Sequence, residues 1–336
     1  MIPFYRLILR RALEISWKNK WIWVLAFFAA FLGQGGAYEF LVRVFNNLFN
    51  GQSLFYTIQD FANSSIFGML SWGNLQSLWV NDLSTFSYGV FSLLLALCVL
   101  AVIVTLSIIS QAGFIRGAIS LDNNKKTTIR KSFHEGLTHF WPVFWINIIT
   151  KIILIGVLML LAYLVSLLIM GNIIVDLILL VLIFVIFIVF GITIYFLTIY
   201  GTAFIVLKNK KTLESLKMAW HLFRKHILVN LEMGLLLFII NVLFGLVFMI
   251  SLFIVLAPFV LLYIMMLMGG YVFGLSILSI IMTIIIFGSI IVLGSFYNSF
   301  QLSAWVILFE ELAVTGGKSK IIRLFDHFKN RKKRKK

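Results

Sequence analysis

The chain alternates long apolar segments with short polar ones, and the apolar segments are too long for the core of a soluble protein. Six such segments can be delimited, at residues 21–44, 88–115, 143–170, 177–207, 227–256 and 271–309. About 20 apolar helical residues already cross the hydrocarbon of a bilayer. The pattern therefore predicts an all-α fold, a polytopic membrane helix bundle with six transmembrane helices.

The last two segments lie in one run, 233–309, that contains 77 residues and no Asp, Glu, Lys, Arg or His. By length alone this run could make three crossings of about 25 residues each. Three crossings would place the very basic C-terminal residues opposite the other basic segments. We therefore predict two long helices, joined by a turn near Pro258 or near Gly269 and Gly270.

The basic residues fall on one side of this threading. Clusters of Lys and Arg precede the first segment and follow the second, fourth and sixth, whereas the segments after the first, third and fifth have none. The exceptions are Arg43 and Lys151, which lie within apolar segments. By the positive-inside rule, both termini should lie in the cytoplasm, with the protein in the cell membrane. The alternative is a signal peptide cleaved near Gly35 and Gly36, which would leave five spans.

Composition supports a membrane protein and excludes several other classes. Apolar residues make up 62% of the chain and charged residues 12%, against about 45–50% and 25% in globular proteins. The net charge of +16 does not indicate nucleic-acid binding, because the cations are distributed among the short loops between spans. The single cysteine, Cys98, excludes a disulfide or a Cys-based metal site within one chain.

An internal repeat divides the chain. Asn-Lys-Lys-Thr occurs at 124–127 and at 209–212, and two histidines five residues apart follow each copy. Near the start, 13–17 resembles 216–220. We predict three tandem units, each an amphipathic cytoplasmic helix followed by a transmembrane hairpin, within a single transmembrane domain. The units are about 1–115, 116–207 and 208–311, the domain is 1–316, an external insertion covers 46–87, and a basic cytoplasmic tail covers 317–336.

The amphipathic helices predict contact with lipid headgroups. Residues 212–225 place apolar side chains at helical spacing, as expected for a helix in the headgroup layer with its apolar face toward the hydrocarbon. The predicted partner is thus the bilayer, with anionic headgroups. The candidate lipid-phosphate contacts are Lys125, Lys126, Lys210, Lys211, Arg224 and Lys225.

A second candidate site is a set of polar residues inside the predicted spans: Glu232, Lys151, Asn147 and Asn241. Glu232 is predicted either to be a protonatable or cation-binding group, or to pair with cations at 224–226. Lys151 is expected either to extend its ammonium to the interface or to pair with Glu232. Asn147 and Asn241, like Asn230, are typical of hydrogen bonds between membrane helices.

The positions of small residues predict close helix packing, and the positions of tryptophans predict where the membrane interface lies. Small side chains permit close helix contacts in membranes, here at Gly113, Gly117, Gly191, Gly201, Gly288 and Gly294. Indole prefers the membrane interface, and seven tryptophans lie near span ends on the predicted cytoplasmic side. They are Trp17, Trp21, Trp23, Trp141, Trp145, Trp220 and Trp305.

No pattern indicates catalysis. His134 and His139 resemble a zinc-protease motif, but two helical ligands must stand four apart to share a face, not five. The sequence contains no P-loop, no Ser/His/Asp arrangement and no paired carboxylates at the membrane faces. We therefore expect a protein without enzymatic activity, cofactor or metal.

The first amphipathic segment reads Arg11-Ala-Leu-Glu-Ile-Ser-Trp17-Lys-Asn-Lys-Trp21. A basic helix and tryptophans before a span resemble a loose group of bacterial six-helix inner-membrane families. That group includes the membrane domain fused to some glycerophosphodiester phosphodiesterases, whose catalytic domain has no counterpart here. The resemblance implies a fold and a location but no site residues. We expect a non-catalytic protein that interacts with lipid or acts as an accessory or scaffold component. The alternatives are a transporter or permease for a small or hydrophobic solute, and a subunit of a lipid enzyme.

Overall fold

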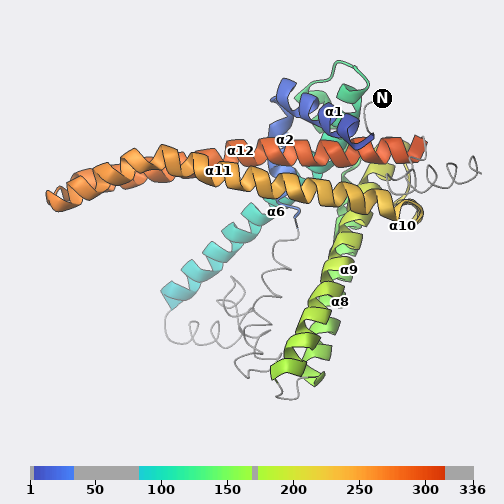
Figure 1. Cartoon of the computed structure of the whole chain (residues 1–336), viewed down its shortest axis with the longest axis horizontal. Helices are drawn as coiled ribbons and strands as arrows, with labels where there is room; N and C mark the ends of the chain where they lie inside the picture. The colour runs from blue at the N-terminus through green and yellow to red at the C-terminus, as the bar shows by residue number, and fades with distance from the viewer. Residues whose placement is uncertain (1–3, 34–82, 169–172, 315–336) are drawn as a thin grey trace, which may run out of the picture.

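The computed structural model describes residues 4–33, 83–168 and 173–314 (Figure 1). Within these ranges the secondary structure is helical and contains no strand, which confirms the all-α prediction. The helices are α1 (Phe4–Lys18), α2 (Ile22–Ala30), α6 (Leu83–Asp122), α7 (Ile129–Thr138), α8 (Phe140–Leu168), α9 (Ile173–Lys208), α10 (Thr212–Lys225), α11 (Ile227–Met268) and α12 (Val272–Val314).

Five of these helices, α6, α8, α9, α11 and α12, are long and apolar enough to cross a membrane. Each corresponds to one of the predicted spans, so the chain is a multi-pass membrane protein. The remaining predicted span starts at α2 and continues into residues outside the described ranges. The tail 317–336 also lies outside them, as does the predicted insertion 46–87 apart from the first residues of α6.

The 77-residue uncharged run forms two helices, as predicted. The turn between α11 and α12 is at Gly269 and Gly270, and Gly270 has a φ of 72°, which glycine adopts without a Cβ clash. Pro258 lies inside α11, so the alternative turn position is wrong. With 42 residues α11 is about 63 Å long, roughly twice the hydrocarbon thickness.

The repeated Asn-Lys-Lys-Thr sequence ends a long helix at each occurrence. Asn124 and Asn209 are the non-glycine residues with positive φ in the described ranges, at 56° and 50°. Asn124 lies two residues after the end of α6 and Asn209 one residue after the end of α9, where a left-handed residue lets later amides cap the free carbonyls. The Lys125 N–H accordingly donates to the Ser120 carbonyl at 2.8 Å. A short helix and two long helices then follow in both places.

The hydrophobic core lies where the helices converge. It includes residues 108–118 of α6, 196–206 of α9, 229–237 of α11 and 300–312 of α12, together with faces of α1, α2, α8 and α10. Beyond this packed end, α6, the α8–α9 pair and the α11–α12 pair extend in different directions (Figure 1), with large apolar side chains exposed. The bundle is therefore packed at one end only. Lipid tails are as apolar as leucine, so burial against protein gives the outer parts little advantage.

The amphipathic helices bury part of their apolar faces against protein. In α1, Tyr5, Ile8, Ala12 and Ile15 are buried at helical spacing. In α10, whose bounds match the predicted 212–225, the buried residues include Ala219 and Phe223, whereas Leu213 and Trp220 are exposed. The predicted lipid-facing surface is thus narrower than expected, because α9, and to a lesser extent α8, occupies part of it.

Glycines bring α6 and α7 into backbone contact. A Cβ at Gly113 would lie 2.6 Å from the Ser132 carbonyl oxygen, and one at Gly136 would lie 3.1 Å from the Gly113 nitrogen. The close-contact prediction holds for Gly113, Gly117 and Gly201, each of which faces a neighbouring helix. It is wrong at two other positions, Gly288 and Gly294, which have open space beside them.

An ion-pair network joins α1, α6 and α12 at the end of the bundle where the Lys- and Arg-rich segments lie. We call this end of the bundle the basic end. Arg11 of α1 donates to Asp122 of α6 through Nε at 2.8 Å, and to Glu311 of α12 through Nη1 at 2.7 Å. The Asp122 side chain is only 2% exposed. These hydrogen bonds, that with Asp122 foremost, raise the pKa of Arg11, so the guanidinium stays charged.

Candidate functional site

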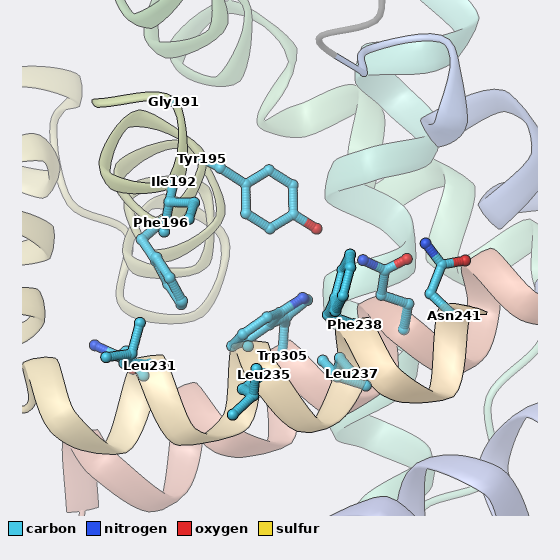
Figure 2. Close-up of a pocket in the computed structure, with 13 residues that line it drawn as sticks. Gly191, Ile192, Tyr195, Phe196, Leu231, Leu235, Leu237, Phe238, Asn241 and Trp305 are labelled. Atoms are coloured by element: carbon cyan, nitrogen blue, oxygen red, sulfur yellow. The ribbon is translucent and has the colours of Figure 1, made fainter. Parts of the chain in front are cut away.

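A groove of about 570 Å³ lies between α9, α11 and α12 (Figure 2). α9 contributes one wall through residues 191–196, α11 contributes positions one turn apart between 230 and 241, and α12 contributes two side chains. The lining residues are Gly191, Ile192, Tyr195, Phe196, Asn230, Leu231, Gly234, Leu235, Leu237, Phe238, Asn241, Gln301 and Trp305.

The groove opens at the protein surface and has an aromatic inner wall. Leu231, Leu235 and Phe238 are exposed along one side, so lipid can reach the opening directly. Inside, Phe196 packs edge-on against Trp305 with ring centroids 4.8 Å apart. Tyr195 extends from α9 toward Trp305, at a centroid distance of 6.3 Å (Figure 2). The groove is thus accessible from the membrane and mostly apolar.

Two buried hydrogen-bond donors in the lining lack a well-placed acceptor. Asn230 is 0% exposed, and although its Oδ1 accepts a 2.6 Å hydrogen bond from the Tyr200 hydroxyl, its Nδ2 has no partner. Trp305 is 3% exposed, and its Nε1 makes only a weak contact with the Tyr195 phenol beside it. A buried donor without an acceptor costs about 1–3 kcal/mol. Both groups would therefore gain from a ligand oxygen that accepts hydrogen bonds.

The lining contains no ionisable side chain other than the Tyr195 phenol. The remaining polar groups are the amides of Asn241 and Gln301, which can donate or accept. A groove of this kind suits an uncharged, mainly apolar molecule that carries a carbonyl, ether or hydroxyl oxygen. A charged group would have no counter-ion here.

The structure does not bring the four predicted intramembrane polar residues together. Asn241 lines the groove, whereas Asn147 is buried between α8 and α6 and donates to Gln111 Oε1 at 2.9 Å. Glu232 lies outside the groove lining and accepts a hydrogen bond from the Tyr5 hydroxyl of α1. Lys151 is half-buried on α8 and makes no ion pair with Glu232.

The predicted interhelical role of the asparagines is confirmed for two of them. Asn147 connects α8 to α6, and Asn230 connects α11 to Tyr200 of α9. Tyr5 was not among the predicted partners of Glu232, because nothing in the local sequence relates positions 227 residues apart. Trp305 is buried at the groove, where α9 and α11 cover it, so its indole does not face lipid; its depth in the membrane stays a prediction.

The predicted lipid-phosphate contacts lie in the α6–α7 loop, in the α9–α10 loop and at the C-terminal end of α10. Lys125, Lys126 and Lys211 are exposed, as are Arg224 and Lys225. The exception is the remaining lysine of the set, Lys210, whose ammonium is 2.6 Å from Glu214 and is thus already neutralised. The loop that carries Lys210 and Lys211 is joined to the α7–α8 junction, where His139 Nε2 is 2.9 Å from Asn209 Oδ1.

A second hollow, of about 380 Å³, lies among the ends of α9, α10 and α12. It includes only one of the predicted phosphate contacts, Lys225, together with Lys208, Lys217 and His221. The sequence did contain a signal for this set, because positions 217, 221 and 225 are spaced four apart and share one face of α10. In the described ranges no group of His, Cys, Asp and Glu side chains is arranged to hold a metal ion.

No family model, curated protein or solved structure matches this chain. What the protein binds must therefore be inferred from the groove and the basic end themselves.

Proposed function

We propose that the protein is a non-catalytic, polytopic membrane protein that binds lipid. The groove between α9, α11 and α12 takes an uncharged, mainly apolar part of a lipid molecule, with an ester or similar oxygen accepting from Asn230 or Trp305. The observation that carries the proposal is the unpartnered Asn230 amide donor beside the weakly engaged Trp305 indole, in a mostly apolar groove that opens beside exposed leucines.

The proposed setting is the cell membrane, crossed six times, with both termini in the cytoplasm. The one-sided distribution of Lys and Arg along the sequence supports this orientation. In that orientation the exposed cations of the basic end face the headgroups of the inner leaflet, where each contributes about 1 kcal/mol toward anionic lipid. A protein that holds lipid in this way can act as an accessory or scaffold component of the membrane.

A permease for a small or hydrophobic solute is the second candidate. The lateral opening and the uncharged lining favour a neutral solute over an ion. A permease must also release its solute on the far side of the membrane, so it predicts solute movement into sealed vesicles, which a lipid-binding protein does not produce.

The decisive experiment identifies what copurifies with the detergent-extracted protein by mass spectrometry, in the wild type and in Trp305→Phe. This change removes the indole N–H and keeps an aromatic ring. One net hydrogen bond is worth about 1 kcal/mol, so retention of the bound molecule should fall about fivefold. The smaller ring also leaves a cavity in the core, so the ligand-free variant should lose about 1 kcal/mol of stability, which thermal unfolding measures separately from retention.

The matched control is Trp220→Phe on α10, an exposed tryptophan outside the groove lining. It should leave retention unchanged. Equal retention by Trp305→Phe and the wild type would contradict the proposal. A diacyl lipid as the retained species supports lipid binding, whereas a small neutral solute that the protein also carries into liposomes favours the permease.

A further inference from the structure

The hollow among the ends of α9, α10 and α12 is lined by cations on an apolar base; we call it the cationic hollow. Its lining residues are Phe204, Lys208, Lys217, Met218, His221, Leu222, Lys225, His226, Leu312 and Ala313. Three lysines from two helices therefore border one space, with two histidines beside them, and the Lys208 ammonium lies over the Phe204 ring, 5.4 Å from its centroid. No carboxylate belongs to the lining.

The three lysines of the cationic hollow are not engaged elsewhere in ion pairs. Among the described residues, none of Lys208, Lys217 and Lys225 lies within 4.0 Å of a carboxylate oxygen. By contrast, Lys210 pairs with Glu214 at 2.6 Å only two residues beyond Lys208. Like charges gathered without counter-ions repel one another, so an anion in the hollow would stabilise the arrangement.

Helix ends do not account for these cations. α9 ends at Lys208 and α10 ends at Lys225, and each C-terminus carries roughly −0.5 charge. The two ends together offer about −1 against three positive charges. The helix ends therefore compensate only part of the positive charge, and an anion bound in the hollow would compensate more of it.

The side chains that line the cationic hollow indicate which kind of anion would bind there. Lysine is a point-charge binder of phosphate groups, and neutral imidazole can add an N–H donor. The apolar floor, which includes Phe204, Met218 and Leu222, suits a phosphate attached to hydrocarbon better than a free ion. α10 also exposes Leu213 and Trp220, side chains that favour the headgroup layer.

We infer that the cationic hollow is a binding site for the phosphate of an anionic lipid headgroup, held by Lys208, Lys217 and Lys225. The inference rests on the lipid-binding function proposed above and names its headgroup class. The groove that carries the proposed function is a separate space, lined by other residues. The two can therefore be tested independently.

The test titrates delipidated, full-length protein in neutral detergent with phosphatidylglycerol or phosphatidylcholine, and counts bound lipid by native mass spectrometry. The variant is Lys208→Gln with Lys217→Gln and Lys225→Gln. One cation near a phosphate is worth about fivefold in affinity, so the triple variant should bind phosphatidylglycerol roughly 100-fold more weakly. Phosphatidylcholine binding should change little, because that headgroup has no net charge.

The control has the same change in net charge at exposed cations outside both the hollow and the predicted phosphate contacts: Lys20→Gln with Arg130→Gln and Lys131→Gln. A comparable loss in the control would overturn the inference, because it would show attraction by net charge alone. Unchanged phosphatidylglycerol binding by the hollow variant would overturn it equally. Thermal unfolding checks folding, and the hollow variant should be at least as stable as the wild type without lipid, since repulsion is removed.

Competition by inorganic phosphate shows whether the cationic hollow binds a lipid headgroup or a free phosphate ion. A lipid site keeps phosphatidylglycerol in the presence of excess phosphate, since the apolar base adds to its affinity. Complete displacement, with no preference for phosphatidylglycerol over phosphatidylcholine, would assign the hollow to a free phosphate ion and overturn the lipid assignment. Loss of binding at the hollow leaves retention at the groove unchanged, so failure of one proposal does not mask failure of the other.

Discussion

Replacing Gly113 by alanine should separate two helices that touch through their backbones. The new Cβ would lie 2.6 Å from the Ser132 carbonyl oxygen of α7 and 3.1 Å from the Ser132 carbonyl carbon. Ordinary contacts begin at about 3.4 Å, so α7 must move away by nearly 1 Å. The obstacle is backbone, which cannot rotate aside as a flexible side chain can.

The cost of this displacement follows from how tightly α7 is held. Overpacking a well-packed site costs about 1–3 kcal/mol, and we expect the upper end because Gly136 of α7 is in close backbone contact with α6 as well. Alanine also gains up to about 1 kcal/mol of helix propensity over glycine. The net destabilisation should be about 2 kcal/mol.

The assay is thermal unfolding of the full-length protein in nanodiscs, with Gly156→Ala as the matched control. Gly156 lies in α8 with open space around its Cβ position, so alanine there gains propensity without a clash. The Tm of Gly113→Ala should fall by several degrees, and that of Gly156→Ala should stay constant or rise. Equal Tm values for the two variants would refute the close packing of α6 on α7.

Two further changes test the basic end. Arg11→Ala leaves the nearly buried Asp122 carboxylate without its cation, which should destabilise the protein by about 3 kcal/mol. Adding Asp122→Asn to this variant should recover part of the loss. Thermal unfolding measures both effects. At Asn124, where φ is 56°, alanine should cost about 1 kcal/mol by thermal unfolding and glycine should be neutral or stabilising; equal effects would argue against a left-handed helix stop.

Helix positions were predictable because their signals are local. The bounds of α10 follow from apolar spacing, and the ends of α6 and α9 follow from an asparagine that tolerates left-handed backbone. The alternative prediction of a turn near Pro258 was wrong because proline breaks helices in water, whereas in membrane helices neighbouring groups satisfy the freed carbonyl. The glycine pair at 269–270 ended the helix instead.

The groove was not predictable because it depends on which helix faces meet. Trp305 and Asn230 each had a reasonable local interpretation, an interfacial indole and an interhelical amide. Only the packing of α9 from one repeat unit against α11 and α12 of the next buries both donors beside one space. The cationic hollow differs, because the four-residue spacing of Lys217, His221 and Lys225 was present in the sequence.

The distribution of polar contacts explains why the packing is confined to one end. Side chains that need a partner on another helix, such as Asn147, Asn230 and Tyr200, all lie in the packed end. In the outer parts, hydroxyls bond to carbonyls of their own helix, as Ser251 does to Phe248 and Thr283 does to Ser279, each at 2.8 Å. A hydroxyl that bonds to its own helix needs no partner on another helix, so hydrocarbon can surround it. Lipid can therefore cover the outer faces of these helix pairs, while hydrogen bonds and ion pairs at the basic end hold the fold together.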